Sequence, residues 1–336
     1  MRGGEGNSKI IRQPNIFRDN FFLLTPPPLK ILLTNPMPKI SLLICTLNDR
    51  VANVASMLLP QRKEVCYVVS FQYTNDLFLQ MIPEELRHRS DVTILPLPKS
   101  GLSVNRNHAL RHCATPLAII ADDDARYTEA QIDHVISTFE QNPDVDIACF
   151  QVLTTDGTPM KPYADYTFDY PQRPRGTYIS SLEIALRLDQ CLPLFDTRFG
   201  LGAPYLSCGE EEVFIHQAHQ YGLCIRYFPF PICTIPNAET TGSRFFYDKR
   251  VRRSKGAVFY MLYSTPMALL RIVYAALTMP LPDAATRAAH HVRPKSSIAL
   301  RWACFRDMFD GFIYIMTHPL NDSVAEEIPI DFQETD

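Results

Sequence analysis

Short apolar runs alternate with helix-like segments through the first half of the chain, and this alternation constrains the fold more than any other feature. The apolar runs are bounded by polar residues and lie at residues 40–45, 65–70, 92–95, 116–121 and 146–152. Such runs indicate strands buried on both faces of a sheet. The helix-like segments between them lie at 51–58, 76–86, 103–113 and 128–140. The alternation predicts right-handed βαβ units and a mostly parallel α/β sheet flanked by helices.

The regular alternation of predicted strands and helices ends after residue 152. Residues 156–177 are rich in Pro, Tyr and Asp and predict a long loop or hairpin. Further on, the sequence predicts a helix at 181–187, a second helix at 210–221 that ends at Gly222, and a strand at 225–228 that ends at Pro229. We therefore expect an α/β domain over 37–245, a mainly helical, apolar region over 246–336, and a disordered extension over 1–36. Met37 resembles the true start of the domain, which would make that extension non-native.

Composition and charge fit an intracellular α/β protein. The net charge of −3 gives no basic surface for nucleic acid, so we expect no nucleic-acid partner. The nine Cys residues show no Cys-x-x-Cys spacing, which favours reduced thiols over disulfides or a zinc site. The N-terminus lacks the pattern of a signal peptide, and no stretch predicts a spanning helix. We expect a cytoplasmic protein, with the inner face of the membrane as the alternative location.

Three adjacent carboxylates, Asp122, Asp123 and Asp124, directly follow the apolar run at 116–121. Ligands gather at the carboxyl ends of strands in open α/β sheets, where this cluster would lie. Side chains alternate along extended backbone, so Asp122 and Asp124 would point one way and Asp123 another. Mg²⁺ and Mn²⁺ bind oxygen ligands, usually one or two carboxylates plus substrate phosphates. The cluster is therefore either a metal–diphosphate site or a solvated acidic turn.

A second acidic cluster, Glu210-Glu211-Glu212, opens the helix predicted at 210–221. The positive end of a helix dipole stabilises carboxylates, and that alone would account for the cluster. With two acidic clusters on one chain, one can bind a metal–phosphate group while the other removes a proton from an attacking hydroxyl.

Four short motifs occur in the order and spacing typical of family-2 glycosyltransferases. Residues 40–48 resemble the opening strand and Thr-x-Asn turn of that family, and residues 101–107 are similar to its Gly-Leu-Ser-x-x-Arg-Asn segment. Residues 119–124 match its Asp-x-Asp metal motif, and Gly209-Glu210-Glu211 stands in the place of its Gly-Glu-Asp motif. The resemblance covers about residues 38–245.

The resemblance implies a GT-A fold and an inverting transfer of a sugar from a nucleotide-diphosphate donor to a hydroxyl of a glycan or lipid-linked acceptor. Asp122 and Asp124 would hold Mg²⁺ or Mn²⁺. Glu211 aligns with the general base of the family, and Glu210 is the second choice. The donor-binding residues would be Thr46, Asn48, Gln72, Arg106, Asn107 and Asp123.

Three departures from the family pattern leave alternatives open. Glu211 replaces the usual Asp, and Ile235 stands where many relatives carry a His that helps to bind metal or phosphate. Ser70-Phe71-Gln72 replaces acidic residues that contact the base, although Gln72 can hydrogen-bond a base and Phe71 can stack on it. One alternative is a nucleotide-sugar-binding homologue with impaired catalysis. A metal-dependent phosphohydrolase or nucleotidyltransferase is the other, but Gly101 is solitary and forms no phosphate-cradling glycine loop.

Residues 256–279 are strongly apolar and aromatic. They predict either a packed helical hairpin or an amphipathic element in peripheral contact with a membrane. In the second interpretation the basic flank would consist of Lys249, Arg250, Arg252, Arg253 and Lys255.

Overall fold

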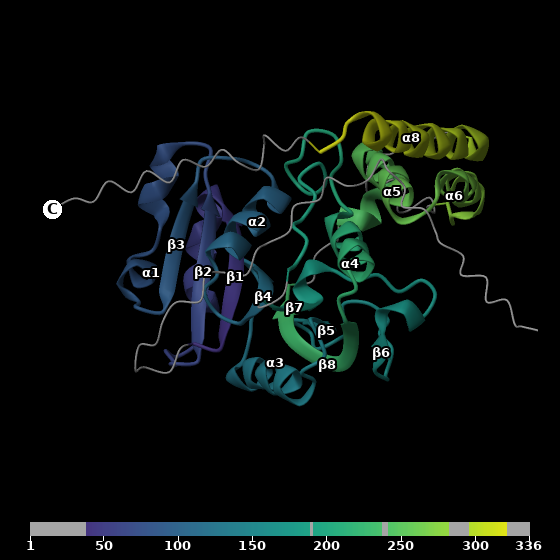
Figure 1. The fold of residues 1–336 in the computed structure, drawn as a ribbon. Helices are drawn as coiled ribbons and strands as arrows, with labels where there is room; N and C mark the ends of the chain where they lie inside the picture. The colour runs from purple at the N-terminus through teal and green to yellow at the C-terminus, as the bar shows by residue number, and fades with distance from the viewer. Residues whose placement is uncertain (1–37, 189–190, 237–240, 282–295, 321–336) are drawn as a thin grey trace, which may run out of the picture.

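The protein is built around one eight-stranded sheet with the strand order β3-β2-β1-β4-β7-β5-β8-β6 (Figure 1). The computed structural model describes residues 38–188, 191–236, 241–281 and 296–320, so the extension expected at 1–36 lies outside the described residues. The strands are β1 (Ile40–Leu47), β2 (Val65–Gln72), β3 (Val92–Leu97), β4 (Leu117–Asp122), β5 (Ile147–Thr154), β6 (Phe168–Asp169), β7 (Ile184–Arg187) and β8 (Ile225–Ile235).

Most of the sheet is parallel, as the alternation of elements predicts. Strands β3, β2, β1 and β4 run parallel to one another, and β5 runs parallel to β8. The antiparallel members are β7, between β4 and β5, and β6, beside β8. The expected class, a mostly parallel α/β sheet flanked by helices with a helical C-terminal part, is confirmed.

Helices cover the sheet and extend beyond it. The α-helices are α1 (Glu84–His88), α2 (Leu102–His112), α3 (Glu129–Gln141), α4 (Glu210–Gln220), α5 (Lys249–Leu262), α6 (Thr265–Thr278) and α8 (Ser297–Thr317). The 3₁₀ segments are η1 (Asn48–Met57), η2 (Asp76–Met81), η3 (Tyr170–Gln172), η4 (Ser181–Glu183) and η5 (Thr241–Phe246). The Thr128 side chain caps α3 in a reciprocal capping box with Gln131, which fixes the start of this helix.

The core lies on both faces of the sheet. Along β1, Leu42 and Ile44 pack into one cluster of buried residues, and Leu43 packs into the other. This alternation follows from the two-residue period of a strand, and it explains why the strand sequence is apolar at nearly every position.

Two predictions about single elements were wrong, and one helix differs in type. The segment 181–187 is mostly strand, because after η4 it forms β7 and bridges β4 and β5. The strand predicted to end at Pro229 continues to Ile235, because β8 pairs with β6 only through Arg226 and Tyr227 and leaves the following prolines without a partner on that side. The segment at 51–58 lies mostly within a 3₁₀ helix, η1, that begins at Asn48.

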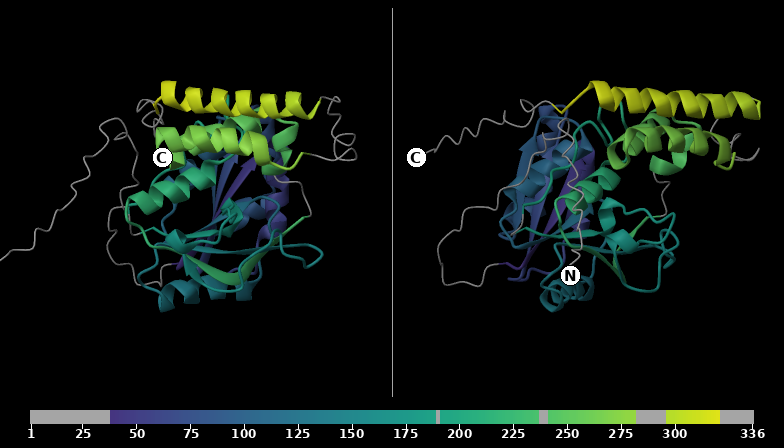
Figure 2. Two further views of the ribbon diagram at one scale, coloured as in Figure 1. Left: turned by 90° about the vertical axis from the view of Figure 1, so that its right-hand side faces the viewer. Right: turned by 45° about the vertical axis from the view of Figure 1, so that its right-hand side comes forward.

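The C-terminal helices form a layer at one end of the molecule, with α8 outermost (Figure 2). Helices α5 and α8 cross at two glycines, where a Cβ on Gly256 would lie 1.7 Å from the Met308 carbonyl oxygen. A Cβ on Gly311 would lie 1.9 Å from the Arg253 carbonyl oxygen. The α5–α6 pair is the helical hairpin expected over 256–279.

The basic flank predicted for a membrane-facing α5 is mostly engaged within the protein. Arg252 Nε lies 2.8 Å from Asp307 Oδ2, Arg253 Nε lies 2.8 Å from Asp310 Oδ2, and Lys255 Nζ lies 3.6 Å from Glu212 Oε2. Arg250 donates to the Ala203 carbonyl. These contacts hold α5 against its neighbours. Among the described residues, no helix is long and apolar enough to span a membrane.

Candidate active site

The aspartate cluster lies at the carboxyl end of β4, beside the end of β1. The side chains of Asp122 and Asp124 are 32% and 40% exposed, whereas that of Asp123 is 3% exposed. Exposure therefore alternates along the cluster. Asp122 and Asp124 present their carboxylates at the surface, while the middle residue is directed into the protein.

Asp123 is neutralised from within the protein. Thr46 Oγ1 donates to Asp123 Oδ2 at 2.7 Å, and Arg50 Nε lies 3.0 Å from both carboxylate oxygens. Arg50 Nη2 also bonds to Asp123 and lies 3.3 Å from Asp124 Oδ2. Thr46 and Asp123 are both buried, so we assign them a supporting role in place of the predicted contact with donor.

Arg50 is a site residue that the sequence reasoning missed. Its side chain is 52% exposed and adjoins the two aspartates. Hydrogen bonding to Asp123 raises its pKa, and burial opposes that rise. A signal was present in the sequence, because a cation three residues beyond the end of β1 must lie near the end of the adjacent β4.

Arg106 joins the two acidic clusters. It lies on α2, is 2% exposed, and its Nη1 donates to Glu210 Oε1 at 3.0 Å and to Glu211 Oε1 at 3.3 Å. Its Nη2 donates to Ser181 Oγ at 2.7 Å and lies 3.6 Å from Asp122 Oδ1. One buried guanidinium therefore faces carboxylates from both clusters, more than 80 positions apart in the sequence.

Opposing influences set the protonation of this group of charges. Burial lowers the pKa of Arg106, but Glu211, Asp122 and Glu210 raise it further, so the guanidinium stays charged. Burial raises the pKa of the Asp122 carboxyl, and Arg106 opposes that rise. Burial and the neighbouring Glu211 raise the pKa of Glu210 to about 8, against the opposing effect of Arg106.

The two candidate bases differ in access. Glu210 is 4% exposed and lies against Gly200, with Oε2 buried and without a hydrogen-bond partner among the described residues. The Glu211 side chain is 19% exposed. An acceptor hydroxyl can therefore reach Glu211 more readily than Glu210.

Backbone geometry fixes the start of α4, which carries both glutamates. Gly209 has φ = 95°, in the left-handed region that favours glycine. A Cβ at Gly209 would lie 2.5 Å from Val258 Cγ2 of α5. The residues before it are held by Ser254 Oγ, which accepts from the Ser207 N–H at 2.8 Å. The first turn of α4 is thus held against α5.

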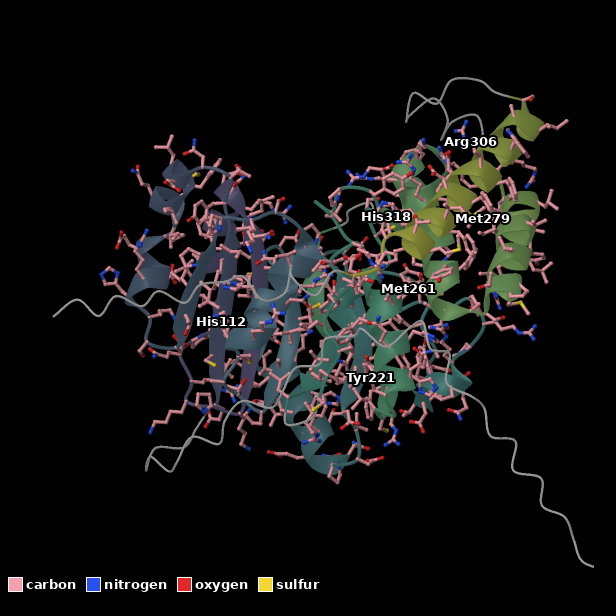
Figure 3. The ribbon with its side chains drawn as sticks, turned by 45° about the horizontal axis from the view of Figure 1, so that its top comes forward. His112, Tyr221, Met261, Met279, Arg306 and His318 are labelled. Carbon is pink, nitrogen blue, oxygen red and sulfur yellow. The ribbon has the colours of Figure 1, made fainter. Side chains whose placement is uncertain are left out.

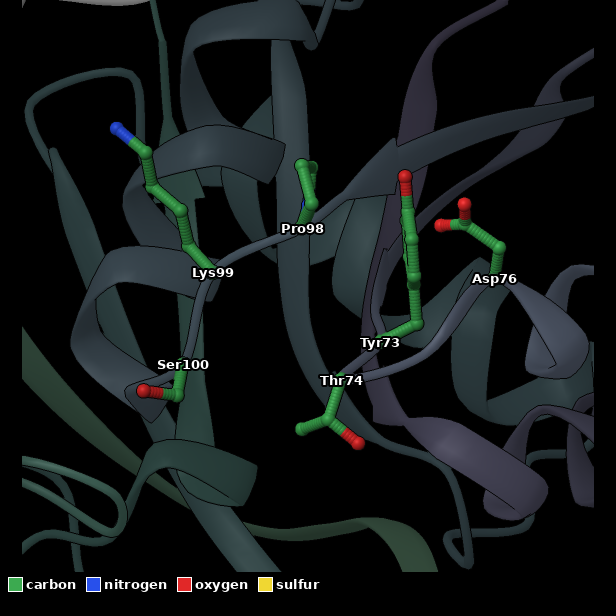
Figure 4. A pocket seen from close by; sticks show the side chains of 6 residues that line it. All are labelled: Tyr73, Thr74, Asp76, Pro98, Lys99 and Ser100. Carbon is green, nitrogen blue, oxygen red and sulfur yellow. The ribbon is translucent and has the colours of Figure 1, made fainter.

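A hollow of about 390 Å³ lies beyond the carboxyl ends of β2 and β3 (Figure 4). It is lined by Tyr73, Thr74, Asp76, Pro98, Lys99 and Ser100. Figure 4 shows the Tyr73 ring and the Asp76 carboxylate on one side and Lys99 on the other. The hollow offers an aromatic face, a carboxylate and a cation to a ligand.

Two predicted donor-binding residues hydrogen-bond the backbone of the segments that line this hollow. Asn48 Oδ1 accepts from the Thr74 N–H at 2.9 Å, and Gln72 Nε2 donates to the Gly101 carbonyl at 3.1 Å. Phe71, expected to stack on a base, is fully buried in the core, and Tyr73 is the aromatic residue at the hollow.

Asn107, also predicted to bind donor, has a structural role. Its Nδ2 donates to the Phe195 carbonyl at 2.8 Å, and its Oδ1 accepts from the Phe195 N–H at 2.8 Å. The amide is satisfied by one backbone residue and is 4% exposed. It anchors the loop before α4 against α2.

The aspartates fit a divalent cation that is shared with a diphosphate. Among the described residues, no group of three or more His, Cys, Asp or Glu side chains forms a metal site. Asp122 and Asp124 are nevertheless partly exposed and lie close enough for Asp124 to raise the pKa of Asp122. Two carboxylates are the number that Mg²⁺ commonly takes from a protein when phosphates and water complete its shell.

Comparison with known sequences identifies the segment that contains β1 to β7. The sequence model of Glycosyl transferase family 2 matches residues 41–189. The match spans less than half of the chain and shows that these residues are similar to a family-2 glycosyltransferase domain. The matched segment includes Arg50, Arg106 and the aspartate cluster, and the match confirms the resemblance inferred from the motifs. No curated protein sequence matches the chain.

Solved structures of S. aureus TarS share a distant likeness with most of the chain. TarS residues 1–349 are 15% identical with a TM-score of 0.48, and the match covers 82% of this chain and 89% of that chain. The same fragment in complex with UDP-GlcNAc is 14% identical with a TM-score of 0.48 and the same coverage. A likeness at this level carries no argument about function.

Proposed function

We propose that the protein is an inverting glycosyltransferase that moves a sugar from a nucleotide-diphosphate donor to a hydroxyl of a glycan or lipid-linked acceptor. The observation that carries this proposal is Arg106, whose guanidinium faces Asp122 in the segment that matches family 2 and Glu210 and Glu211 on α4. It links a candidate diphosphate site to a candidate general base.

Glu211 is the general base of the proposed reaction. As the acceptor oxygen bonds to the anomeric carbon, the bond from that carbon to the diphosphate oxygen breaks and the electron pair leaves with the diphosphate. Glu211 takes the proton of the acceptor hydroxyl. Arg106 holds the carboxylate in position through the contact of 3.3 Å between Nη1 and Oε1.

The leaving diphosphate lies by Asp122 and Asp124 in this proposal. These residues would hold Mg²⁺ or Mn²⁺, which neutralises the charge that develops on the leaving group. Arg50 lies on the same side, bonded to Asp123 and Asp124, and its exposed guanidinium adds a cation beside the diphosphate. The nucleotide occupies the hollow lined by Tyr73, Asp76 and Lys99.

Donor binding tests the metal assignment. Titration calorimetry with a panel of nucleotide sugars should give binding that depends on Mn²⁺ or Mg²⁺ and is lost on chelation. Asp124→Ala should abolish the metal-dependent part, whereas Asp144→Ala, at a carboxylate 60% exposed elsewhere, should leave it unchanged. Equal donor affinity of Asp124→Ala and the parent protein in Mn²⁺ would refute the metal role.

Turnover tests the base. Glu211→Gln should keep donor binding and lower turnover by about a hundredfold or more, since the amide cannot accept the proton. Glu212→Gln, in the same helical turn, is the matched control and should leave turnover unchanged. If Glu211→Gln keeps its turnover, the base is Glu210 or another group.

The same assays separate two other functions. Donor binding without sugar transfer and without donor hydrolysis would identify a binding protein with impaired catalysis. Two sequence features favour this alternative: Ile235 stands in place of a His, and the Glu211 side chain is longer than the usual Asp. Release of phosphate from free nucleotides would identify a phosphohydrolase. Each outcome contradicts the proposed transferase.

A further inference from the structure

Helices α6 and α8 carry large apolar side chains on their outer sides. Three of these side chains form a stripe on each helix, and their exposed fractions are 61% for Leu270, 66% for Tyr274, 61% for Leu277, 82% for Ile298, 64% for Trp302 and 39% for Phe309. The spacing of three, four or seven residues places the members of each stripe on one side of their helix. We call these six residues the α6–α8 face.

Helices α6 and α8 are in contact near the end of α6 and the start of α8. Arg301 Nη1 donates to the Ala276 carbonyl at 3.0 Å, which places Trp302 and Leu277 at the same junction. Aromatic rings continue along α8, with Trp302 and Phe305 centroids 5.5 Å apart and Phe305 and Phe309 centroids 6.0 Å apart. Large apolar side chains gathered on an exposed surface indicate an interaction site.

The charged residues around the α6–α8 face are mainly basic. The sequence has no acidic residue between Asp248 and Asp283, so α6 carries Arg271 as its one charged group. On α8, Arg306 is 60% exposed, and Figure 3 labels it on the outer helix. The carboxylates of α8 are all paired: Asp307 is shared by Arg252 and Arg306, and Asp310 pairs with Arg253. Two cations share the one carboxylate of Asp307, so an excess of positive charge remains.

We propose that the α6–α8 face docks on the surface of an anionic lipid membrane. Leu and Ile side chains would enter the acyl boundary, Trp302 and Tyr274 would lie at the headgroup level, and Arg271 and Arg306 would contact lipid phosphates. The helices lie on the bilayer in this arrangement, in keeping with the absence, among the described residues, of a helix able to span it.

Charge argues for lipid over a second copy of the chain. A two-fold interface would place the same patch of both copies together, so Arg271 and Arg306 would lie in an interface with an excess of cations. These arginines would then face like charges, whereas anionic headgroups supply the opposite charge. The membrane is therefore the occupant that the face complements.

Trp302 provides a direct test, because it is the one tryptophan of the chain. We expect its emission to shift to shorter wavelength when vesicles of phosphatidylcholine with phosphatidylglycerol are added. Brominated acyl chains in those vesicles should quench it, and vesicles of phosphatidylcholine alone should have a much smaller effect. Unchanged emission at saturating anionic lipid would overturn the proposal.

Flotation with the same anionic vesicles tests the face by substitution. Leu270→Glu with Leu277→Glu should lower the bound fraction about tenfold or more, since both carboxylates would enter the lipid boundary. Leu77→Glu is the matched control, at a leucine 66% exposed on η2, and should float as the parent protein does. Circular dichroism and donor affinity report whether each variant is folded.

Two outcomes of the flotation experiment would contradict the proposal that the α6–α8 face binds lipid. Equal flotation of the parent and the double variant would show that another surface binds lipid. Absence of lipid binding, together with a dimer in light scattering that the double variant converts to monomer, would assign the face to a second copy. Neither result bears on transferase activity, so failure here is distinct from failure of the proposed function.

Discussion

At the residue scale, Arg106 decides how the site is held together. It is among the largest fully buried side chains, and carboxylates of Asp122, Glu210 and Glu211 surround its guanidinium. An ion pair of this kind contributes little net stability when intact, because burial costs each charge its hydration. Breaking it is costly, because the remaining charges stay buried without compensation.

Arg106→Met should therefore destabilise the protein by about 3–5 kcal/mol near neutral pH. The measurement is the free energy of unfolding in urea. Arg111→Met, at an exposed position on the same helix, is the control and should change it by about 0.5 kcal/mol or less. The loss at Arg106 should shrink in acid, because protonated carboxyls no longer need the guanidinium. Similar small losses for both variants would contradict the role of Arg106 as the link.

Glu210 predicts a pH dependence of stability. Its pKa is raised from 4.5 to about 8 in the folded protein, so between these values the folded state holds a proton that the unfolded chain has released. The contribution of this group to stability is therefore complete below about pH 4.5 and is lost as the pH rises through about 8.

Glu210→Gln removes that dependence. From about pH 5 to about pH 8, without added metal, the parent protein should lose stability relative to Glu210→Gln in urea unfolding. Glu212→Gln, whose side chain is 25% exposed, should run parallel to the parent. A constant difference between the parent and Glu210→Gln across this range would contradict the raised pKa.

At the element scale, the crossing of α5 and α8 depends on the absence of two side chains. Gly256 and Gly311 let the backbones of the two helices meet, and the Arg252–Asp307 and Arg253–Asp310 pairs lie at the same crossing. Glycine is ordinarily a poor residue for a helix interior. Its presence here reflects packing between helices and not the preference of either helix alone.

Gly256→Ala separates these two effects. Helix propensity alone would stabilise the protein by about 1 kcal/mol. The new Cβ would instead lie 1.7 Å from the Met308 carbonyl oxygen, so we expect a net loss of about 3 kcal/mol in thermal or urea unfolding. Met316→Ala, on the exposed side of α8, should cost about 0.5 kcal/mol or less. A gain in stability for Gly256→Ala would show that the helices do not cross so closely.

At the scale of the whole molecule, the helical layer and the sheet domain share a core. Phe199, Leu206 and Val213 from the region of α4 pack with Ala257 and Val258 of α5 and Ile315 of α8 in one buried cluster. The first turn of α4 carries Glu210 and Glu211, so the candidate base rests on a helix of the C-terminal layer. The α6–α8 face belongs to the same layer, and the shared core couples the packing of this layer to the position of the candidate base.

Val258→Ala tests this coupling. Removing two buried methyl groups that face Gly209 should lower the free energy of unfolding by about 2 kcal/mol. It should also speed hydrogen exchange at the amides of the first turn of α4. Val273→Ala, at a valine 42% exposed on α6, is the control and should change neither. Faster exchange confined to α5, α6 and α8 would instead indicate two independent units.

The sequence by itself determined the strand–helix order from residue 40 to 154, the start of α3 at Thr128 and the start of α4 at Gly209. These are local signals, since periodicity, caps and glycine conformation act within a few residues. The two acidic clusters and Arg106 were also found from local motifs. The antiparallel strand β7 was missed, because its partners β4 and β5 are set by the sheet and not by its four residues.

The tertiary structure alone decided which charged and polar side chains lie in contact with one another. It placed Arg50 on Asp123 and directed Asn107 to the Phe195 backbone. It also turned the basic side chains of α5 inward and left Leu270 and Trp302 outward. Burial and pairing of a side chain depend on residues distant in sequence, and no local pattern encodes them. The sequence therefore specified the chemical groups, and only the fold determined which of them remain open to a ligand.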